Sequence, residues 1–238
     1  MNNHSFGCDF GSYHLKIYNR DADGYLMQHN MVAVQDKNKL LACGDEAYAM
    51  YEKAPANIHV GAPMSYGNLA SISNMQAFLK KLLEENIKGQ LKGADFFVAL
   101  PTDMQERNFT MLIQDSAMKP KTVYLVDKPV AAGLGLGINV KEAQGVLIVD
   151  IGAETTEISV LSLGGTVISR LIQTGGRSID DAIQSAIRKE YSFFIGSKTA
   201  ENIKKELLQR FKKEERRELT VLHRALHTGV WTAVFDQD

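Results

Sequence analysis

The chain has 238 residues, which is long enough to bury one large hydrophobic core or two smaller ones. Hydrophobic residues make up 45% of it, an ordinary share for a soluble protein, and the formal net charge of −1 lacks the basic surplus of a nucleic-acid-binding protein. The two cysteines, Cys8 and Cys43, form no disulfide or metal-binding pattern and suit a reducing cytosol.

The sequence contains neither a targeting segment nor a membrane span. The first residues, Met1–Ser5, are too short and too polar for a signal peptide. No apolar run approaches the roughly 18 residues that a membrane-spanning helix needs. We therefore expect a cytoplasmic protein that reaches a membrane only peripherally or through an adaptor.

The first third of the chain alternates between strands and helices. An apolar strand leads to Asp9, and Asp21–Gly24 predicts a hairpin turn into a strand over Tyr25–Val34. A helix is expected at Gly44–Glu52. Residues 75–87 predict a second helix, because its apolar residues recur at helical spacing on one core-facing side. These apolar residues are Met75, Phe78, Leu79, Leu82, Leu83 and Ile87.

The middle of the chain predicts a strand, a helix and a second strand. Phe96–Leu100 has the composition of a buried strand. Asp103–Glu106 has the spacing of a capping box, whose aspartate would begin a helix that runs through Ala117. Val123–Val126 predicts another strand, and Pro129 follows in the first turn of a helix, where proline is tolerated.

The last part of the chain resumes with three strands and two helices. Strands are expected near residues 145–150, 156–163 and 166–173. One helix follows Gly175–Gly176, and another covers Ala200–Phe211. The apolar face of the first of these helices consists of Ile179, Ala182, Ile183, Ala186 and Ile187.

One kind of turn occurs twice in the chain. The first reads Asp9-Phe10-Gly11-Ser12-Tyr13 and the second Asp150-Ile151-Gly152-Ala153-Glu154-Thr155-Thr156, so each joins a carboxylate at a strand end to glycine and hydroxyls. Glycine lets backbone N–H groups approach a phosphate closely, and the two aspartates can hold a metal ion through its waters. The pair indicates a site that grips a phosphate from two sides, and two ordinary strand–turn–strand units are the alternative.

Three longer segments resemble one protein family. Residues 42–75, 123–137 and 145–206 carry the motifs GDEA, SLGG and TAE-x-IK in this order, and together they resemble MreB, the bacterial actin homologue that organises cell-wall synthesis in rod-shaped cells. The resemblance covers roughly residues 5–210 and stops near Phe211. Beyond that point one more amphipathic helix is predicted by Leu219, Leu222, Leu226 and Val230.

The resemblance implies an α/β fold of the actin-like, ribonuclease-H-like type, duplicated into two halves that flank a nucleotide cleft. Residues 1–143 would form the first half, with a small insertion at about 29–70. Residues 144–190 would form the core of the second half, and 191–238 the start of its small insertion and a divergent tail. Because family members continue well beyond this length, we expect the second half to be incomplete.

The resemblance also implies which residues would bind ATP and Mg²⁺. Asp9 and Asp150 would hold the metal ion through water. A helix of the second half would supply Glu201 and Lys204 to the ribose and base, since residues three apart share one helix face; a weak surface ion pair is the alternative. The expected cofactor-binding residues are Asp9, Gly11, Ser12, Tyr13, His14, Gly152, Ala153, Glu154, Thr155, Thr156, Glu201, Asn202, Ile203 and Lys204.

Both turns depart from the family pattern beside the phosphate. MreB has small residues in its first turn, where this chain has Tyr13 and His14. MreB has three glycines in its second turn, where this chain has Gly152, Ala153 and Glu154. Glu154 would place a carboxylate where the polyphosphate lies, and like charges at short range repel by several kcal/mol when they are partly desolvated.

The position that would orient the attacking water is changed as well. MreB carries a glutamate immediately before the proline of the corresponding helix, whereas this chain has Lys128, preceded by Asp127. An ammonium group accepts no proton unless its pKa falls far, and a neighbouring Asp127 would aim elsewhere. We therefore assign no catalytic residue, and expect Lys128 either to neutralise phosphate charge or to pair with Glu154.

Two functions follow from these observations. The first is that of an MreB-type cytoskeletal protein in cell-shape determination, which forms filaments or co-assembles with a full-length MreB and has weakened ATP binding and hydrolysis. The alternative is a non-hydrolysing actin-fold interaction module, or a truncated product, that binds a full-length relative. Either would be cytoplasmic, at or near the inner face of the cell membrane, without a nucleic-acid partner. A chaperone or sugar kinase ranks behind both.

Overall fold

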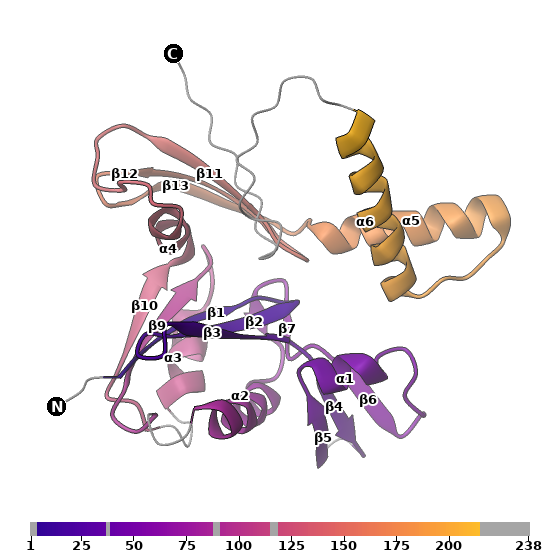
Figure 1. Cartoon of the computed structure of the whole chain (residues 1–238), viewed down its shortest axis with the longest axis horizontal. Coiled ribbons are helices and arrows are strands. Elements are labelled where there is room, and N and C mark those ends of the chain that lie inside the picture. The colour runs from indigo at the N-terminus through magenta and orange to yellow at the C-terminus, as the bar shows by residue number, and fades with distance from the viewer. Residues whose placement is uncertain (1–3, 37–38, 88–90, 115–118, 215–238) are drawn as a thin grey trace.

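The computed structural model describes residues 4–36, 39–87, 91–114 and 119–214 of the chain. Strands and helices alternate along these residues and form a five-stranded sheet, two three-stranded sheets and one two-stranded hairpin. Figure 1 shows the five-stranded sheet with helices packed below it, and one three-stranded sheet joined to it from above. This arrangement is the mixed α/β architecture that the sequence predicts.

The five-stranded sheet has the strand order β10-β9-β1-β2-β3. Strands β1, β9 and β10 run parallel, whereas β1, β2 and β3 form an antiparallel meander. Side chains alternate along β1, so that Phe6, Cys8 and Phe10 are buried. The strands are β1 (Ser5–Phe10), β2 (His14–Asn19), β3 (Gly24–His29), β9 (Asp95–Leu100) and β10 (Thr122–Asp127).

The helix α2 (Ile72–Asn86) lies against this sheet and carries the expected apolar face. It begins three residues before the predicted range, because the Ser71 hydroxyl accepts a hydrogen bond from the Asn74 N–H at 3.3 Å and caps the helix start. All six apolar residues predicted to face the core are buried, and they pack with strand residues such as Phe6 and Phe96. This cluster is the main hydrophobic core.

The capping-box prediction was wrong. Helix α3 (Glu106–Gln114) begins at the glutamate that was expected in its first turn, and Asp103 has a positive φ of 63° that a capping residue does not adopt. The helix still packs its apolar face onto the core through Phe109, Leu112 and Ile113. The predicted end of the helix at Ala117 lies outside the described residues.

The single strand predicted over Tyr25–Val34 is in fact two strands in different sheets. Strand β3 ends at His29, and the chain turns at Asn30 and Met31. The next strand then pairs elsewhere, in a sheet of order β5-β4-β6. The remaining elements of this region are β4 (Val32–Gln35), β5 (Lys39–Cys43), α1 (Asp45–Met50), β6 (Ile58–Gly61), β7 (Met64–Ser65) and β8 (Asn68–Leu69).

The second three-stranded sheet is an antiparallel meander of order β11-β12-β13. Helix α4 (Lys128–Gly135) follows β10 directly and packs against this sheet. Gly133 makes the close packing feasible, because a Cβ there would stand only 2.9 Å from Leu161 Cδ1 and Val140 Cγ1. The strands are β11 (Val146–Ile151), β12 (Thr156–Ser162) and β13 (Gly165–Ile172).

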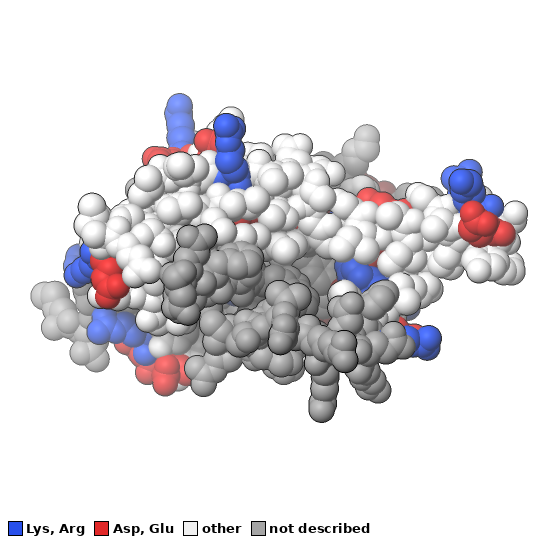
Figure 2. Space-filling model, turned by 90° about the horizontal axis from the view of Figure 1, so that it is seen from above, with Lys and Arg blue, Asp and Glu red and all other residues white. Residues whose placement is uncertain are grey.

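The apolar face predicted for helix α5 (Gly176–Tyr191) is largely uncovered by the described residues. Ile179 is 51% exposed, and Ile183 and Ile187 are only half-buried. The loop that leads to α6 (Ser197–Glu214) adds Phe193 and Phe194, which are 68% and 80% exposed. Figure 2 views the molecule from above, and on the described part of that face the charged side chains stand apart among uncharged residues.

The helix predicted from Leu219 to Val230 lies outside the described residues. Within the described part of the chain, none of the helices is long and apolar enough to cross a membrane.

The exposed aromatic pair generates a prediction about self-association. We expect the wild-type chain to associate with rising concentration in sedimentation velocity, because adjacent exposed phenylalanines favour burial against another molecule. Replacing Phe193 and Phe194 by serine should shift the population toward monomer. Tyr25→Ser is the matched control, because Tyr25 on strand β3 is 68% exposed, and it should leave the fraction of monomer unchanged. A wild-type monomer at every concentration would contradict the prediction.

Candidate functional site

The two turns found in the sequence have the same backbone geometry. In the first, the Gly11 N–H donates to the His14 carbonyl oxygen with an N···O distance of 3.0 Å. In the second, the Gly152 N–H donates to the Thr155 carbonyl oxygen at 2.8 Å. Each turn joins two antiparallel strands, β1 to β2 and β11 to β12. The sequence duplication therefore corresponds to a structural one.

A buried asparagine supports the first turn. The Asn30 side-chain amide donates to the Gly11 carbonyl oxygen at 2.8 Å, and the Asn30 N–H donates to the Tyr13 carbonyl oxygen at 2.8 Å. Asn30 is fully buried and lies beyond the end of β3, far from the turn in sequence. The sequence analysis missed this residue, because no local pattern distinguishes it from a loop asparagine.

The N-terminus of α5 supports the second turn. The Gly176 N–H donates to the Gly152 carbonyl oxygen at 2.9 Å, and the Arg177 N–H donates to the Ala153 carbonyl oxygen at 2.7 Å. Glycine is required just before the helix, because a Cβ on Gly175 would stand 2.6 Å from the Gly152 oxygen. The first N–H groups of this helix are thus used within the protein.

Lys128 lies between the two aspartates that were expected to hold a metal ion. Its Nζ is 3.1 Å from a carboxylate oxygen of Asp150 and 3.7 Å from one of Asp9. Burial lowers the pKa of Lys128, but the two carboxylates outweigh burial and raise the pKa above its ordinary value. Lys128 therefore pairs with these aspartates and not with Glu154, which corrects one of the expectations above.

Asp9 is in contact with a second cation. Lys16 Nζ lies 3.5 Å from its other carboxylate oxygen. Burial raises the pKa of Asp9, but Lys128 and Lys16 together outweigh burial and hold that pKa below its usual range. Asp127, the other residue at the hydrolytic position, accepts a hydrogen bond from the Thr166 hydroxyl at 3.3 Å on strand β13. The Asp127 side chain is thus engaged with β13.

Glu154 is buried and paired. Its carboxylate accepts a hydrogen bond from the Tyr66 N–H at 2.6 Å and forms an ion pair with the Arg177 guanidinium. The sequence analysis foresaw the carboxylate but neither partner. A signal for Arg177 existed, because a cation in the first turn of a helix is unfavourable unless an anion is close. No local signal pointed to Tyr66, which lies in the β7–β8 turn, 88 residues away in sequence.

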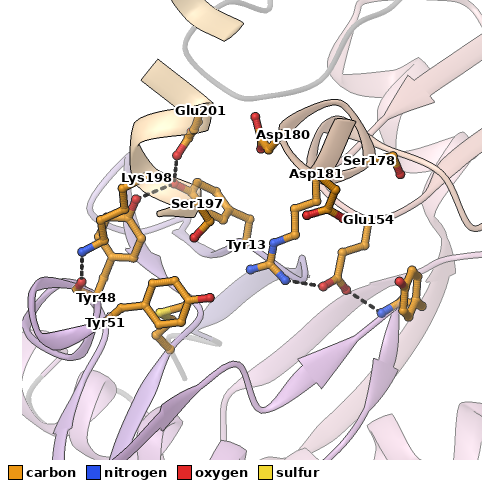
Figure 3. A pocket seen from close by; sticks show the side chains of 13 residues that line it. Tyr13, Tyr48, Tyr51, Glu154, Ser178, Asp180, Asp181, Ser197, Lys198 and Glu201 are labelled. Carbon is orange, nitrogen blue, oxygen red and sulfur yellow. Dashed lines mark hydrogen bonds and ion pairs between the residues drawn. The ribbon is translucent and has the colours of Figure 1, made fainter. Parts of the chain in front are cut away.

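A cavity of about 300 Å³ lies between the two turns and the helices α1, α5 and α6 (Figure 3). This volume is at the lower end of the range for ligand pockets. Aromatic and charged residues are interspersed in its lining; the Lys198 ammonium, for example, lies 4.0 Å from the centroid of the Tyr48 ring. The lining residues are Tyr13, Met31, Tyr48, Tyr51, Tyr66, Glu154, Arg177, Ser178, Asp180, Asp181, Ser197, Lys198 and Glu201.

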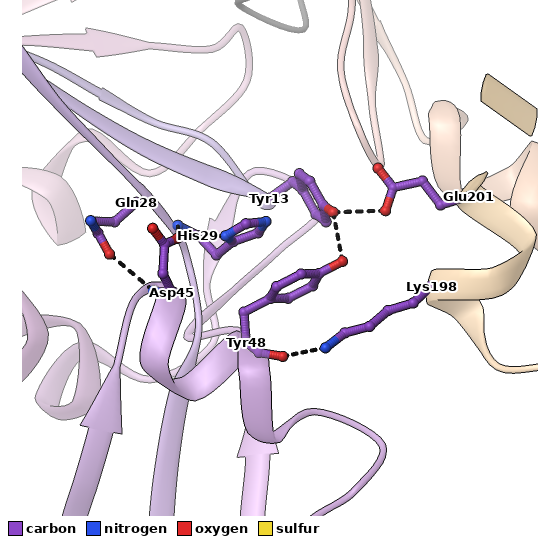
Figure 4. A network of polar contacts seen from close by, with 7 residues as sticks. All are labelled: Tyr13, Gln28, His29, Asp45, Tyr48, Lys198 and Glu201. Carbon is purple, nitrogen blue, oxygen red and sulfur yellow. Dashed lines mark hydrogen bonds and ion pairs between the residues drawn. The ribbon is translucent and has the colours of Figure 1, made fainter. Parts of the chain in front are cut away.

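Tyr13 connects the first turn to helix α6 across this cavity (Figure 4). Its hydroxyl donates to a Glu201 carboxylate oxygen at 2.8 Å and lies 3.1 Å from the Tyr48 hydroxyl. Burial and these two partners raise the pKa of Tyr13 above its ordinary value. Lys198 adds a parallel contact, because its ammonium donates to the Tyr48 carbonyl oxygen.

His14 lies beside Tyr13 and is not among the residues that line the cavity. The two ring centroids are 4.7 Å apart, and His29 stacks on Tyr48 with centroids 3.8 Å apart. Burial, with a smaller contribution from His29, lowers the pKa of His14 to about 4. The His14 ring is therefore neutral at pH 7 and supplies no charge to an anion.

The four residues expected to bind the ribose and base, Glu201–Lys204, have different surroundings in the structure. Only Glu201 lines the cavity, while Asn202 is exposed and Ile203 is half-buried. Lys204 binds Asp180 instead of Glu201, with Nζ 2.8 Å from one carboxylate oxygen, and it also donates to the Gly176 carbonyl oxygen at 2.9 Å. The weak surface ion pair considered for Glu201 and Lys204 is therefore absent.

The hydroxyl groups of the two turns also have partners within the protein. The buried Ser12 hydroxyl accepts from the Gly67 N–H at 3.4 Å, next to the Tyr66 N–H that binds Glu154. The Thr156 hydroxyl donates to the Thr174 carbonyl oxygen at 2.7 Å, and Thr155 is half-buried in the turn. The β7–β8 hairpin thus contacts both turns at the place expected for phosphate.

The residues present fit part of a nucleotide but do not fit the expected metal ion. The cavity has aromatic surface, the cations Arg177 and Lys198, and enough volume for part of a nucleotide. The metal site does not fit, because an ammonium group lies between Asp9 and Asp150. Among the described residues, no group of three or more His, Cys, Asp or Glu side chains is arranged to hold a metal ion.

The Tyr13–Glu201 contact generates a prediction about stability. Tyr13→Phe should lower the free energy of unfolding by about 1–3 kcal/mol, since it removes a hydroxyl bonded to a charged, half-buried partner. Burial raises the pKa of Glu201, but hydrogen bonds from Lys205 and Tyr13 outweigh burial and hold that pKa below its ordinary value of 4.5. The stability difference between the variant and wild type should therefore be present at neutral pH, and it should vanish as the pH falls through the folded-state pKa of Glu201. Urea unfolding at pH 7 and at a series of lower pH values that extends below the folded-state pKa measures it, with the exposed Tyr25→Phe as control.

Equal urea midpoints for Tyr13→Phe and wild type at pH 7 would contradict this prediction.

Comparison with known proteins identifies the family. The model of the MreB/Mbl protein family matches residues 3–235. The cell shape-determining protein Mbl of Bacillus subtilis is 31% identical over 229 residues, which cover 94% of this chain and 68% of that protein. The cell shape-determining protein MreB of Escherichia coli K12 is 32% identical over 241 residues, which cover 97% of this chain and 69% of that protein.

Solved structures agree with this assignment. The structure of MreB5 of Spiroplasma citri bound to ADP superposes with a TM-score of 0.79 at 31% identity and covers 86% of this chain, which spans 62% of the MreB5 chain. A MamK double helical filament, at 20% identity and a TM-score of 0.70, shares the fold. The family match runs past Phe211, so the expectation that similarity stops there was wrong. The chain has an actin-like fold and belongs to the MreB/Mbl family of cell-shape-determining proteins.

Proposed function

We propose that this chain is a cytoskeletal protein of the MreB type that contributes to cell shape by self-association or by co-assembly with a full-length MreB. Family membership supports the cytoskeletal role. The exposed apolar residues of α5 and the following loop support association, because they offer surface that a neighbouring molecule can bury. Heterologous contacts of such surfaces extend into filaments when they do not close into a ring.

The chain binds adenine nucleotide weakly under this proposal. MreB5 of Spiroplasma citri has been solved with ADP and with AMPPNP, which supports an adenine nucleotide as the ligand. The observation that carries the proposed weakness is the pairing of Glu154 with Arg177 and the Tyr66 N–H. A phosphate entering between the turns must compete with this carboxylate for the same donors, and it meets the carboxylate's negative charge.

Hydrolysis is slow or absent under this proposal. The side chain at the water-orienting position is Lys128, whose ammonium is engaged with Asp9 and Asp150. Its raised pKa keeps it protonated at neutral pH, and a protonated amine cannot accept a proton from water. Asp127 is bonded to Thr166 and does not replace it.

The protein acts in the cytoplasm and meets the inner face of the cell membrane through its assembly partner or an adaptor. Association with a membrane-bound relative or an adaptor would hold the protein at that surface, because contacts made by several linked molecules add up.

A second candidate is an interaction module that binds a full-length relative without using nucleotide. The observation that favours it is the same set of contacts across the cavity, from Tyr13 to Glu201 and from Tyr66 to Glu154, which links the two turns and α6 through the protein's own groups. Complete absence of ATP binding at millimolar concentration, together with intact binding to a relative, would favour this candidate over the first.

The nucleotide proposal predicts the effect of neutralising Glu154. Wild type should bind ATP with a dissociation constant near the millimolar range and release phosphate at background rate. Glu154→Gln should bind ATP roughly tenfold more tightly, since it removes one negative charge and frees Arg177, and tenfold corresponds to about 1.4 kcal/mol. Calorimetric titration measures the affinity, with the exposed Glu142→Gln as the matched charge control.

Phosphate release by wild type at the rate of a full-length MreB would contradict the proposed loss of hydrolysis. An unchanged affinity in Glu154→Gln would show that Glu154 is not the cause of weak binding.

A further inference from the structure

We propose that the Lys128 ammonium takes the place of the divalent cation between the two turns, so that this chain holds phosphate without Mg²⁺. The inference rests on the proposed function for its nucleotide, but the cation position itself is defined by the protein alone. The positive charge between Asp9 and Asp150 would then come from a side chain of the protein and not from a bound metal ion.

The first support is the position of the ammonium. Asp9 and Asp150 are the second-to-last residues of strands β1 and β11, at equivalent places before the duplicated turn. A hydrated metal ion shared by these two carboxylates would have to lie between them. Lys128 Nζ already contacts one oxygen of each, at 3.7 Å and 3.1 Å.

The second support is the local charge. Asp9 also contacts Lys16 Nζ at 3.5 Å, so two carboxylates already face two ammonium groups. A dication added here would meet two like charges at short range and would lack an unpaired carboxylate. Glu157, on strand β12 just after the second turn, is buried and accepts the Thr102 N–H at 2.8 Å, which ties its carboxylate to the backbone.

The third support is how the fold fixes the lysine. Lys128 is the first residue of α4, directly after the parallel strand β10, and Pro129 follows in the first helical turn. A cation at a helix N-terminus is unfavourable by itself, so its stability there depends on the two carboxylates. The side chains of Lys128, Asp9 and Asp150 are 22%, 28% and 9% exposed, so the three charges are largely shielded from water.

The consequence for a ligand is direct. A nucleotide phosphate that reaches the turns meets an ammonium that is present at every Mg²⁺ concentration. Affinity for the nucleotide should therefore be the same with Mg²⁺ and with a chelator. In a site that uses a metal ion, the cation arrives with the nucleotide and its removal weakens binding.

Manganese binding tests the cation position without any nucleotide. We would titrate MnCl₂ into the full chain and follow free Mn²⁺ by electron paramagnetic resonance. Wild type should leave the signal unchanged at micromolar concentrations. Lys128→Ala and Lys128→Gln should each gain one site that binds at least tenfold more tightly, and Asp150→Asn in the Lys128→Ala background should abolish it. Lys189→Ala, at an exposed position of α5, should match wild type.

Wild type that binds Mn²⁺ as tightly as Lys128→Ala would overturn the proposal, and so would Lys128 variants that melt cooperatively yet gain no site. If Lys128→Ala and Lys128→Gln both fail to fold, the proposal is tested on wild type alone. ADP is then titrated calorimetrically into wild type, once with 5 mM Mg²⁺ and once with EDTA. Affinities that agree within twofold support the proposal, and a tenfold loss in EDTA overturns it. Absence of ADP binding in both conditions contradicts the proposed function, while the manganese result for wild type still decides the cation position.

Discussion

The contact on which the site depends is the ion pair of Lys128 with Asp9 and Asp150. Two carboxylates at the ends of neighbouring turns repel each other when they are partly buried, and a cation between them is needed to hold the turns together. Here that cation belongs to α4, the helix that packs between the five-stranded sheet and the β11-β12-β13 sheet. The duplicated turns are therefore joined by the protein's own charge.

The same principle recurs across the cavity. Glu154 is paired with Arg177 and the Tyr66 N–H, and Glu201 accepts the Tyr13 hydroxyl, so the acidic groups that face the cavity from the second turn and α6 are satisfied within the chain. Buried charges that lose a partner are costly, and each of these contacts must open before a ligand takes its place. Under the proposed function, assembly would be controlled by concentration or by partners rather than by nucleotide turnover.

The sequence predicted helices and turns more reliably than the contacts between side chains. Helix α2 and the duplicated turns follow from apolar spacing and from glycine beside a carboxylate, which are local patterns. The strand expected over Tyr25–Val34 failed because its apolar pattern continues across Asn30 while the chain changes sheets. Of the residues expected to bind the cofactor, Tyr13, Glu154 and Glu201 line the cavity. The contacts of Tyr66 with Glu154 and of Lys128 with Asp150 were not predicted, because they arise from tertiary packing that no local pattern encodes.

The most direct test of this account is a crystal of the full chain soaked with ADP and MnCl₂, with data collected at the manganese absorption edge. Anomalous scattering at this edge distinguishes Mn²⁺ from a water molecule or an ammonium group. The account predicts no anomalous peak between Asp9 and Asp150, and electron density that joins Lys128 Nζ to both carboxylates. A manganese peak between these carboxylates, with Lys128 turned away, would contradict it.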